Sequence, residues 1–297
     1  MDVIARYPEF SPLSFEAVQA IKGDLQSLKG GISELTLGSL YFFKDFYTYH
    51  ISQLTDHTFI FRGKEQGKPF FFIAGDDVPA SAIKELYTDC AYWKSISEPF
   101  LHTHATLFHD IGAEPQEDRN NFDYLYTRQS LSTLSGKKLH KKKNHVNGFL
   151  HSYPAFSLKP LNHETKNDAA QILEIWAAEQ TSIIDTDYQA ARQALAADTL
   201  EDFIGLVLYV EDTPIAWCLA ELAEQGTIAV VHFEKARTDF RGSYQYINYA
   251  FAQSLPEHVV YINREQDLGD EGLRHAKMSY YPEAFVKKYR LDKGALE

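Results

Sequence analysis

One stretch of the chain concentrates side chains that can hold an anion. From Arg128 to His163 the sequence contains no aspartate or glutamate, although the whole protein has a formal net charge of −12. Attraction of the entire chain to polyanions is therefore absent, and a basic island of this kind acts locally on a phosphate or a carboxylate. The residues of this segment that we expect to bind such a group are Lys137, Lys138, His140, Lys141, Lys142 and Asn144.

This basic segment is also predicted to be helical. Leu139, Val146 and Phe149 recur on one side of a helix over 134–150, and the lysines fill another side. A solvated lysine face is the ordinary explanation of such a pattern. However, no acidic residue stands at i±4 to relieve the repulsion between the lysines, which costs roughly a few tenths of a kcal/mol per pair. We therefore favour an anionic ligand.

A second stretch carries side chains suited to acyl transfer. It follows a predicted strand over 258–262, and functional groups often lie on the loops that follow strands. Glu265 and Asp267 can orient or deprotonate an amine, and Arg274 and Lys277 can hold a carboxylate or stabilise an oxyanion. The alternative is an internal network of these four charges, because buried charges must be paired in either case. The candidate catalytic residues are Asn263, Glu265, Asp267, Arg274, Lys277 and Tyr280.

Other chemistries are not indicated. His102 and His104 alternate along a predicted strand, but no cysteine or HExxH-type partner accompanies them, so we expect no metal site. The two cysteines, Cys90 and Cys218, have no CxxC neighbour and are expected to be core residues in a reducing compartment. The sequence contains no GxSxG, Walker A or dinucleotide-binding motif.

The composition is that of a soluble globular protein. The chain of 297 residues is long enough for two ordinary domains, with 44% hydrophobic and 24% charged residues. Its start lacks the basic and apolar regions of a signal peptide. No window approaches the roughly 18 uninterrupted apolar residues of a membrane span. We therefore expect a cytoplasmic protein without a transmembrane segment.

The pattern of predicted elements is similar in the two halves. Each half combines helices, a hairpin and further strands, with a weak boundary near 152–159, which predicts an α+β protein with domains 1–155 and 156–297. In the first half we predict helices over 14–28 and 80–93, a hairpin of 58–61 with 69–73, and strands over 101–108 and 122–126. In the second half we predict helices over 168–179, 188–197 and 244–255, a hairpin of 204–210 with 215–220, and strands over 227–233 and 258–262.

The second half resembles an acyl-CoA N-acyltransferase (GNAT) domain in the order of its elements. Domains of that family hold the CoA pyrophosphate on a loop of the form Arg/Gln-x-x-Gly-x-Gly/Ala that opens a helix. Arg241 and Gly242 are similar to part of this loop, so we include them among the phosphate-binding candidates. Tyr244 stands where a small residue is required, which makes CoA doubtful as a cofactor.

Longer motifs resemble a more specific family. Ser33–Thr36, Gly136–Asn147 and Asn263–Pro282 are similar to an uncharacterised bacterial family related to the C-terminal domain of phosphatidylglycerol lysyltransferase. The resemblance covers essentially the whole chain. It implies two tandem GNAT-like folds, each a mixed sheet flanked by helices, and a relation to Fem-type transferases that use aminoacyl-tRNA. A tyrosine hydroxyl is a familiar proton donor in GNAT-like sites, so Tyr280 is a candidate for that role, with a packing role as the alternative.

Two functions are compatible with these features. The first is an aminoacyl-type acyltransferase that moves an amino acid from aminoacyl-tRNA, or a similar activated donor, to an amine or hydroxyl of a small molecule or lipid headgroup. In that case the basic segment holds donor phosphates, and the groups from Asn263 to Tyr280 position the acceptor. The second is a non-catalytic GNAT-like binding module that senses a nucleotide, a tRNA or a phospholipid headgroup.

Overall fold

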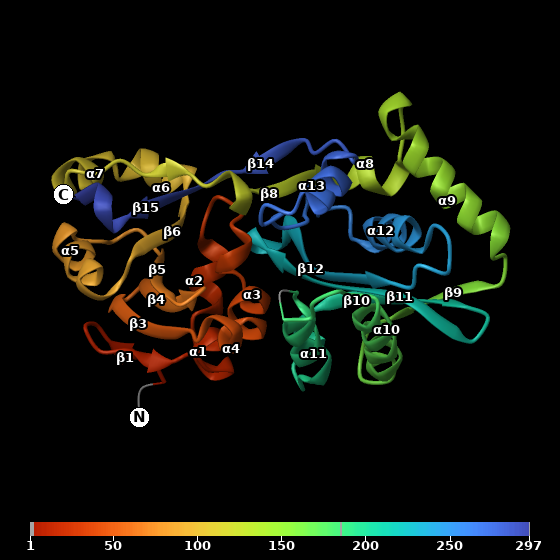
Figure 1. Cartoon of the computed structure of the whole chain (residues 1–297), viewed down its shortest axis with the longest axis horizontal. Coiled ribbons are helices and arrows are strands. Elements are labelled where there is room, and N and C mark those ends of the chain that lie inside the picture. Colours follow the sequence, from red (N-terminus) through yellow and green to blue (C-terminus); the bar gives the residue numbers. More distant parts are fainter. Residues whose placement is uncertain (1–2, 185, 297) are drawn as a thin grey trace. The chain divides into compact units, whose positions relative to one another are not determined.

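Two mixed sheets organise the structure, and each belongs to its own unit of the chain (Figure 1). The computed structural model describes residues 3–184 and 186–296. Its contacts divide it into a first unit of Met1–Asp123, Gln266–Gly269 and Phe285–Glu297, and a second unit of Tyr124–Glu265 and Asp270–Ala284. The predicted α+β fold, with two mixed sheets flanked by helices, is confirmed.

The first unit is built on a sheet with the strand order β1-β3-β4-β5-β6-β15-β7, in which β2 also pairs with β3. Its strands are β1 (Ala5–Arg6), β2 (Ser11–Pro12), β3 (His50–Thr55), β4 (Thr58–Glu65), β5 (Lys68–Ala74), β6 (Tyr92–Ser97), β7 (Gln116–Glu117) and β15 (Lys288–Asp292). Its helices are α1 (Phe15–Ala20), α2 (Lys22–Ser27), α3 (Leu37–Phe42), α4 (Lys44–Tyr47), α5 (Ala80–Asp89), α6 (Glu98–Thr103) and α7 (Ala105–Ile111). Short 3-10 turns are η1 (Ser33–Leu35), η2 (Arg119–Asn121) and η6 (Lys293–Leu296).

Aromatic side chains fill both faces of this first sheet. Because successive side chains of a strand point to opposite faces, Phe70 and Phe71 of β5 lie on different sides. The ring of Phe70 lies 5.8 Å from that of Tyr47 in α4. The ring of Phe71 lies 5.3 Å from that of Tyr87 in α5. Helices α4 and α5 therefore cover opposite faces of the sheet (Figure 1). Most of β5 is buried.

The second unit is built on a sheet with the strand order β14-β8-β13-β12-β11-β10-β9. Its strands are β8 (Asp123–Thr127), β9 (Phe156–Pro160), β10 (Ile204–Val210), β11 (Thr213–Ala223), β12 (Ile228–Ala236), β13 (Tyr261–Asn263) and β14 (Ala284–Val286). Its helices are α8 (Arg128–Thr133), α9 (His140–Ser152), α10 (Lys166–Ala178), α11 (Tyr188–Ala196), α12 (Ser243–Ser254) and α13 (Glu271–Met278), with 3-10 turns η3 (Lys137–Leu139), η4 (Leu200–Asp202) and η5 (Glu224–Gly226). Helices α10 and α11 lie on one face of the sheet and α12 on the other (Figure 1).

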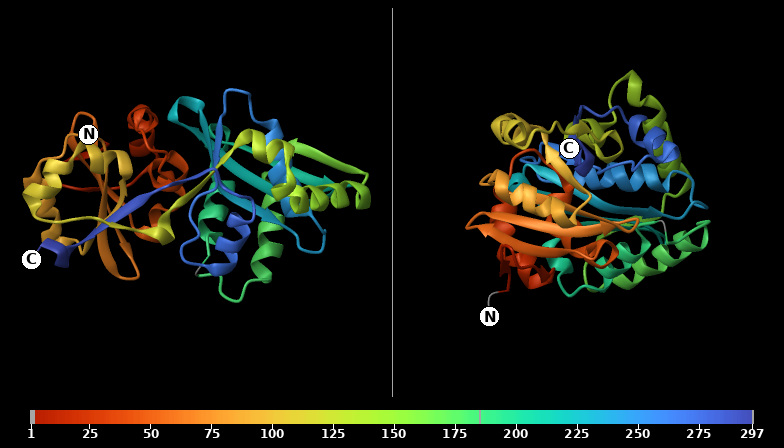
Figure 2. Two further views of the ribbon diagram at one scale, coloured as in Figure 1. Left: turned by 90° about the horizontal axis from the view of Figure 1, so that it is seen from above. Right: turned by 60° about the vertical axis from the view of Figure 1, so that its left-hand side comes forward.

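The two sheets repeat one arrangement of strands. In the first sheet, β4 and β5 are antiparallel, β6 is parallel to β5, and β15 is antiparallel to β6. In the second, β11 and β12 are antiparallel, β13 is parallel to β12, and β8 is antiparallel to β13. The last strand of each series comes from the other half of the sequence, and in Figure 2 the blue C-terminal strand lies among the orange strands of the first unit. The two halves of the chain thus exchange one strand.

This exchange places the division of the chain elsewhere than the predicted boundary between 1–155 and 156–297. Residues 124–155 belong to the second unit, because β8 pairs with β13. Residues 285–297 belong to the first unit, because β15 pairs with β6. The segment near 152–159, which suggested a linker, includes β9 at the edge of the second sheet.

Several predicted elements are confirmed, and others are wrong. The strand over 204–210 and the helix over 188–197 are present as β10 and α11. Residues 101–108 are helical, because the Ser97 hydroxyl caps α6 by accepting a hydrogen bond from the Phe100 amide at 3.1 Å. The helix over 80–93 ends at Asp89, because the following residues pair with β5 as strand β6. The strand over 258–262 begins only at Tyr261.

The exchanged strand leads to the first prediction. Deletion of residues 285–297 removes β15 together with the last two residues of β14, so β6 loses a hydrogen-bonded neighbour and the first unit loses a buried lysine. We expect the thermal transition of the first unit to disappear in circular dichroism or calorimetry. Deletion of residues 293–297 leaves β15 complete and is expected to change the melting temperature little. A chain without residues 285–297 that melts like the full chain would contradict the exchange.

Candidate functional site

Strands β12 and β13 stop pairing at the point where charged side chains follow on both strands. They pair in parallel only from Ile228 with Tyr261 to Val230 with Asn263, although β12 continues to Ala236. Two bridges cross the divergence beyond the last pair. The guanidinium of Arg264 lies 3.1 Å from the carboxylate of Glu234, and a ring nitrogen of His232 lies 2.8 Å from the carboxylate of Glu265. Charged side chains thus occupy the place where backbone hydrogen bonds between the strands end.

A bulge at the end of β13 directs these side chains. The Arg264 amide donates to the Tyr124 carbonyl at 3.0 Å, and the Tyr124 amide donates to the Glu265 carbonyl at 3.2 Å, so two residues oppose one. Glu265 has a φ of 54°, in the left-handed region that costs a non-glycine residue on the order of 1–3 kcal/mol. The buried Asn263 side chain stabilises this turn by accepting from the Glu265 amide at 2.8 Å.

Lys277 supports the same bulge from α13. Its ammonium donates to the Arg264 carbonyl oxygen at 2.6 Å and lies 5.7 Å from the centre of the Tyr124 ring. The residue is buried, and the Tyr126 hydroxyl donates to its carbonyl oxygen at 2.8 Å. We therefore assign Lys277 a role in holding the backbone beside the site.

His232 is the buried centre of a second bulge, in β12. The register steps from Leu219 with Phe233 to Ala220 with Val231, so His232 is the extra residue. Its fully buried ring contacts Glu265 at 2.8 Å and Glu221 at 3.3 Å. Burial alone would lower the pKa of this imidazole, but the two carboxylates more than offset burial and raise the pKa to about 9. His232 is therefore a cation at neutral pH, and it holds Glu265 in place.

Arg264 links this cluster to two tyrosines. Its guanidinium lies 5.1 Å from the centre of the Tyr280 ring and 6.0 Å from that of Tyr126. The buried Asn248 side chain donates to the second oxygen of Glu234 at 3.1 Å, so that carboxylate has two partners. Burial raises the pKa of Tyr280 to about 12. The Tyr280 hydroxyl accordingly stays protonated at neutral pH, and its role as a proton donor stays a prediction.

One lysine of the basic segment reaches this cluster. Lys142 of α9 is half-buried, and its ammonium lies 4.1 Å from the centre of the Tyr280 ring, so Lys142 and Arg264 both contact that ring. Burial and then the charge of Arg264 lower the pKa of Lys142. No carboxylate of the described residues forms an ion pair with Lys142, although its surroundings exclude much of the water. One helical turn earlier, the Lys138 ammonium lies 5.6 Å from the centre of the Tyr281 ring.

The other candidates of the basic segment are on the surface. Lys137, His140, Lys141 and Asn144 are exposed, and the Asn144 amide lies 3.5 Å from a ring nitrogen of His140. Together with Lys138 and Lys142, the lysines among them extend the positive charge along η3 and α9. Their role in anion binding stays a prediction.

Gly242 has a packing role in the structure. It begins α12 with a φ of 89°, and a Cβ atom at this position would lie 2.9 Å from the carbonyl oxygen of His145 in α9. The rings of Phe149 and Tyr246 stack beside it with centres 4.6 Å apart. The close approach of α9 and α12 thus explains this glycine, while phosphate binding by Gly242 and the exposed Arg241 stays a prediction.

The six predicted catalytic residues do not form one network. Asp267 belongs to the first unit, where it accepts from Arg119 at 3.2 Å and from the Gly269 amide at 2.9 Å. Arg274 lies partly exposed on α13 in the second unit. The structure brings together Asn263, Glu265, Lys277 and Tyr280, and it adds Lys142 from the basic segment.

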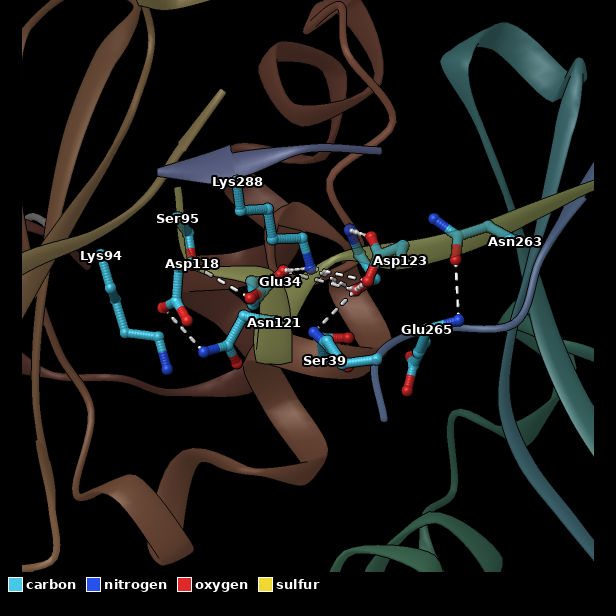
Figure 3. A network of polar contacts seen from close by, with 12 residues as sticks. Glu34, Ser39, Lys94, Ser95, Asp118, Asn121, Asp123, Asn263, Glu265 and Lys288 are labelled. Carbon is cyan, nitrogen blue, oxygen red and sulfur yellow. Dashed lines mark hydrogen bonds and ion pairs between the residues drawn. The ribbon is translucent and has the colours of Figure 1, made fainter. Parts of the chain in front are cut away.

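The first unit contains a separate buried charge network around Lys288. The fully buried ammonium lies 2.6 Å from Asp123, forms a short hydrogen bond with Glu34, and lies 3.3 Å from the Ser33 hydroxyl. The Ser33 amide and hydroxyl each donate to Asp123 at 2.9 Å, and Ser95 donates to Glu34 at 3.0 Å. Figure 3 shows Lys288 reaching from β15 toward Glu34 and Asp123.

Mutual attraction keeps this network charged. Burial alone would raise the pKa of Glu34, but the Lys288 ammonium, aided by Lys94, more than offsets burial and lowers it. Burial alone would lower the pKa of Lys288, but Asp123 and Glu34 raise it. Glu34 and Lys288 are therefore ionised together at neutral pH.

Sequence reasoning missed several of these residues. His232 stands singly in the strand predicted over 227–233, Glu234 follows that strand, and Lys288 lies in a stretch without a motif. Only Ser33–Thr36 carried a signal, through its resemblance to the family, and η1 of that motif supplies two partners in the Lys288 network. His102 and His104 lie on α6 and at its end, not on a strand. Among residues 3–184 and 186–296, no group of three or more histidine, cysteine or acidic side chains is placed to hold a metal ion.

The Lys288 network gives the second prediction. Lys288→Met leaves Asp123 and Glu34 buried without an ammonium, and breaking a buried pair in this way costs about 3–5 kcal/mol. We expect that loss in the free energy of unfolding, measured with urea at pH 7. Replacing the carboxyls as well, with Asp123→Asn and Glu34→Gln, should recover part of it. The control is Lys287→Met at the neighbouring, more exposed lysine, which should change stability little.

The pH dependence of the same pair follows from the direction of its pKa shifts. The pKa of Glu34 is lowered, so its contribution is present above about pH 4.3 and is lost as the pH falls through the folded value. The pKa of Lys288 is raised, so its contribution is present below about pH 10.4 and is lost as the pH rises through the folded value. Equal acid and alkaline sensitivity in the wild type and Lys288→Met would contradict this account.

His232 gives the third prediction. Its pKa is raised from 6.5 to about 9, so the stabilisation is complete below pH 6.5 and disappears as the pH rises toward 9. The total change in the free energy of unfolding is on the order of 3 kcal/mol. We expect His232→Gln to remove this slope in urea titrations, whereas His140→Gln at an exposed histidine should keep it. A wild-type protein with a flat profile between pH 6.5 and 9 would disprove the assignment.

Most of the chain matches a known family. The family described as phosphatidylglycerol lysyltransferase, C-terminal, matches residues 26–292. An uncharacterised protein of Mycoplasmoides gallisepticum is 28% identical over 177 residues, which cover 56% of this chain and 54% of that protein. The chain therefore matches about half the length of this relative. No described helix is both long and apolar enough to cross a membrane.

Solved structures share the fold. A conserved protein of unknown function from Bacteroides thetaiotaomicron has a TM-score of 0.85 at 25% identity, covering 95% of this chain and 98% of that one. L-PGS from Bacillus licheniformis has a TM-score of 0.67 at 14% identity, covering 98% and 94%. FemX has a TM-score of 0.61 at 8% identity, covering 95% and 96%. The last two similarities are evidence of a shared fold alone. The resemblance predicted from the sequence motifs is confirmed, and the chain belongs to the family of the phosphatidylglycerol lysyltransferase C-terminal domain.

Proposed function

We propose that this protein is an aminoacyltransferase that moves an amino acid from aminoacyl-tRNA to an amine or hydroxyl acceptor. Membership of a lysyltransferase family supports aminoacyl-transferase-like activity in general. The observation that carries the specific proposal is Lys142, a half-buried ammonium without a carboxylate partner among the described residues, placed against Tyr280 and repelled by Arg264.

A phosphate of the donor would complete this arrangement. An anion beside Lys142 offsets both its partial burial and its repulsion by Arg264. Lys138 stands one helical turn away, and exposed cations continue along α9. Phosphates of a polynucleotide are spaced repeatedly along a chain, so a row of lysines on one helix suits them better than it suits a single small anion.

The groups at the β13 bulge suit the transfer step. The acceptor nitrogen or oxygen attacks the ester carbonyl carbon of the donor, and the C–O bond to the tRNA ribose breaks from the tetrahedral intermediate. Glu265 takes the proton of the acceptor, with His232 holding the carboxylate in place. The Tyr280 hydroxyl donates a hydrogen bond to the carbonyl oxygen as negative charge develops there. The proton that Glu265 takes from the acceptor then passes to the leaving ribose oxygen, so the carboxylate is regenerated and the reaction balances.

The fourth prediction tests the donor. Lys142→Met should weaken binding of aminoacyl-tRNA at least about tenfold, or ~1.4 kcal/mol, in filter binding or fluorescence anisotropy at low salt. Lys143→Met, at an exposed lysine on the same helix, is the matched control and should weaken binding much less. Wild-type affinity should also fall steeply as salt rises, because displaced counterions drive the association.

Transfer itself is measured with radiolabelled aminoacyl-tRNA and a panel of amine and hydroxyl acceptors. A transferase releases the amino acid from the tRNA into a product, and Glu265→Gln slows this step while tRNA binding persists. Binding without any loss of the aminoacyl group would favour the non-catalytic binding module. Absence of tRNA binding at low salt, or equal effects of Lys142→Met and Lys143→Met, would refute the proposed donor site.

A further inference from the structure

The bulge that positions Arg264 has a counterpart in the first unit. Strands β5 and β6 pair in parallel only through Phe70 with Tyr92 and Phe71 with Trp93, and Lys94 follows the last pair as Arg264 follows Asn263. The register between β6 and β15 then shifts, so that Lys94 and Ser95 together oppose Arg290. The φ of Ser95 is 55°, and that of Glu265 in the second unit is 54°.

The same left-handed backbone conformation occurs at equivalent positions of the two units, which indicates that it has a structural or functional role. A left-handed, non-glycine residue inside a strand is uncommon and persists only where the surroundings hold it. Bulges change the direction of a side chain and are frequent beside functional sites. In each unit a cation directly follows the last pair of the two parallel strands and precedes the left-handed residue. Lys94 therefore has the position in the first unit that Arg264 has in the second. Arg264 reaches beyond that pair to Glu234. Lys94 instead lies against Phe70 of β5 and Glu65 of β4.

The Lys94 ammonium is poorly satisfied for a buried charge. Its side chain is 5% exposed, and its one hydrogen-bond partner among the described residues is a Glu65 oxygen at 3.5 Å, the upper limit for such a bond. The remaining contacts are the faces of Phe70, 4.8 Å from the ring centre, and Tyr47, 5.2 Å away. An ammonium has three donors, and only one of those of Lys94 has a hydrogen-bond acceptor among the described residues. Figure 3 shows the Lys94 side chain extending beside Asp118 and Asn121.

The charges around Lys94 limit which kind of ligand can provide further hydrogen-bond acceptors for its ammonium. The carboxyls of Glu34 and Asp118 are close enough to interact electrostatically with Lys94, and Glu65 is the third acidic neighbour. A phosphate or another simple anion would be repelled by these three groups. A molecule with both a carboxylate and an ammonium avoids this repulsion, because Glu65 can bind the ammonium. The side chain of Glu65 is 30% exposed.

We propose that the first unit holds a separate site for a free amino acid, in which Lys94 binds the α-carboxylate and Glu65 binds the α-ammonium. The Tyr92 hydroxyl, which donates to Glu65 at 2.7 Å, fixes that carboxylate. The faces of Tyr47 and Phe70 close the apolar side of the site. The site uses none of the residues assigned to donor binding, and its existence does not depend on the proposed transfer reaction.

The fifth prediction tests this site with the full chain. Thermal shift and calorimetric titration are performed with the twenty standard amino acids, with their carboxamides, and with dipeptides. At least one free amino acid should raise the melting temperature at millimolar concentration, whereas its carboxamide, which lacks the negative charge for Lys94, should not. Lys94→Met should weaken this binding at least tenfold. Lys64→Met, at an exposed lysine of β4 beside Glu65, should leave it unchanged.

Further variants decide between the possible outcomes. Glu65→Gln should also weaken amino-acid binding, and it provides the test if Lys94→Met does not fold. Lys142→Met should bind the amino acid normally, which separates a failure of this proposal from a failure of the donor site. No shift with any amino acid, binding of dipeptides alone, or unchanged binding in Glu65→Gln and a folded Lys94→Met would overturn the proposal.

Discussion

The buried ammonium of Lys288 is the interaction on which the organisation of the chain depends. A lysine without exposure to water needs ionised partners, and Asp123 and Glu34 provide them from segments far away in the sequence. Satisfying this one charge brings the C-terminal strand β15 beside β6, which closes the sheet of the first unit. Apolar contacts alone would not select this strand, because many segments of the chain can cover an apolar edge, whereas few can pair with two buried carboxylates.

The exchange of strands explains why the two halves look alike and yet do not separate at their midpoint. Each sheet continues from an antiparallel hairpin to a parallel strand, and each is completed by a strand from the other half. In both sheets a cation directly follows the last parallel pair, and a bulge with a left-handed residue comes next. A repeated fold has thus kept a repeated polar position, with arginine in one unit and lysine in the other.

The charged residues of the second unit differ in whether a group of opposite charge or a hydrogen-bond acceptor lies beside them. Residues with such partners stabilise the fold, and a residue without them can bind a ligand. Arg264 pairs with Glu234, Lys277 holds a backbone carbonyl, and His232 lies between two carboxylates. These groups support the site from within the fold. Lys142 contacts the Tyr280 ring, is repelled by Arg264, and has no carboxylate partner among the described residues. Binding of an anion beside its ammonium is therefore favourable. This contrast, within a family named for an aminoacyl transfer reaction, is the physical basis of the proposed donor site.

The sequence alone determined those properties that depend on local pattern. The helix over 188–197 and the hairpin of 204–210 follow from the periodicity of apolar residues, and the absence of acidic residues around α9 marks the basic segment. Resemblance of the motifs identified the family. It also predicted two sheets flanked by helices.

Tertiary structure decided everything that depends on partners distant in the chain. No pattern in the sequence marks His232 or Lys288 as functional or structural charges. The carboxylates that pair with them lie at the end of β13, in β8 and in η1, which are distant from them in the chain. Asp267, placed by its motif beside Glu265, instead pairs with Arg119 in the other unit. Local pattern reports which face of an element is apolar, but it carries no information on which distant strand completes a sheet or which charge neutralises a buried ion. Only folding settles those choices, since the cost of burying an unpaired charge is avoided only when distant segments come together.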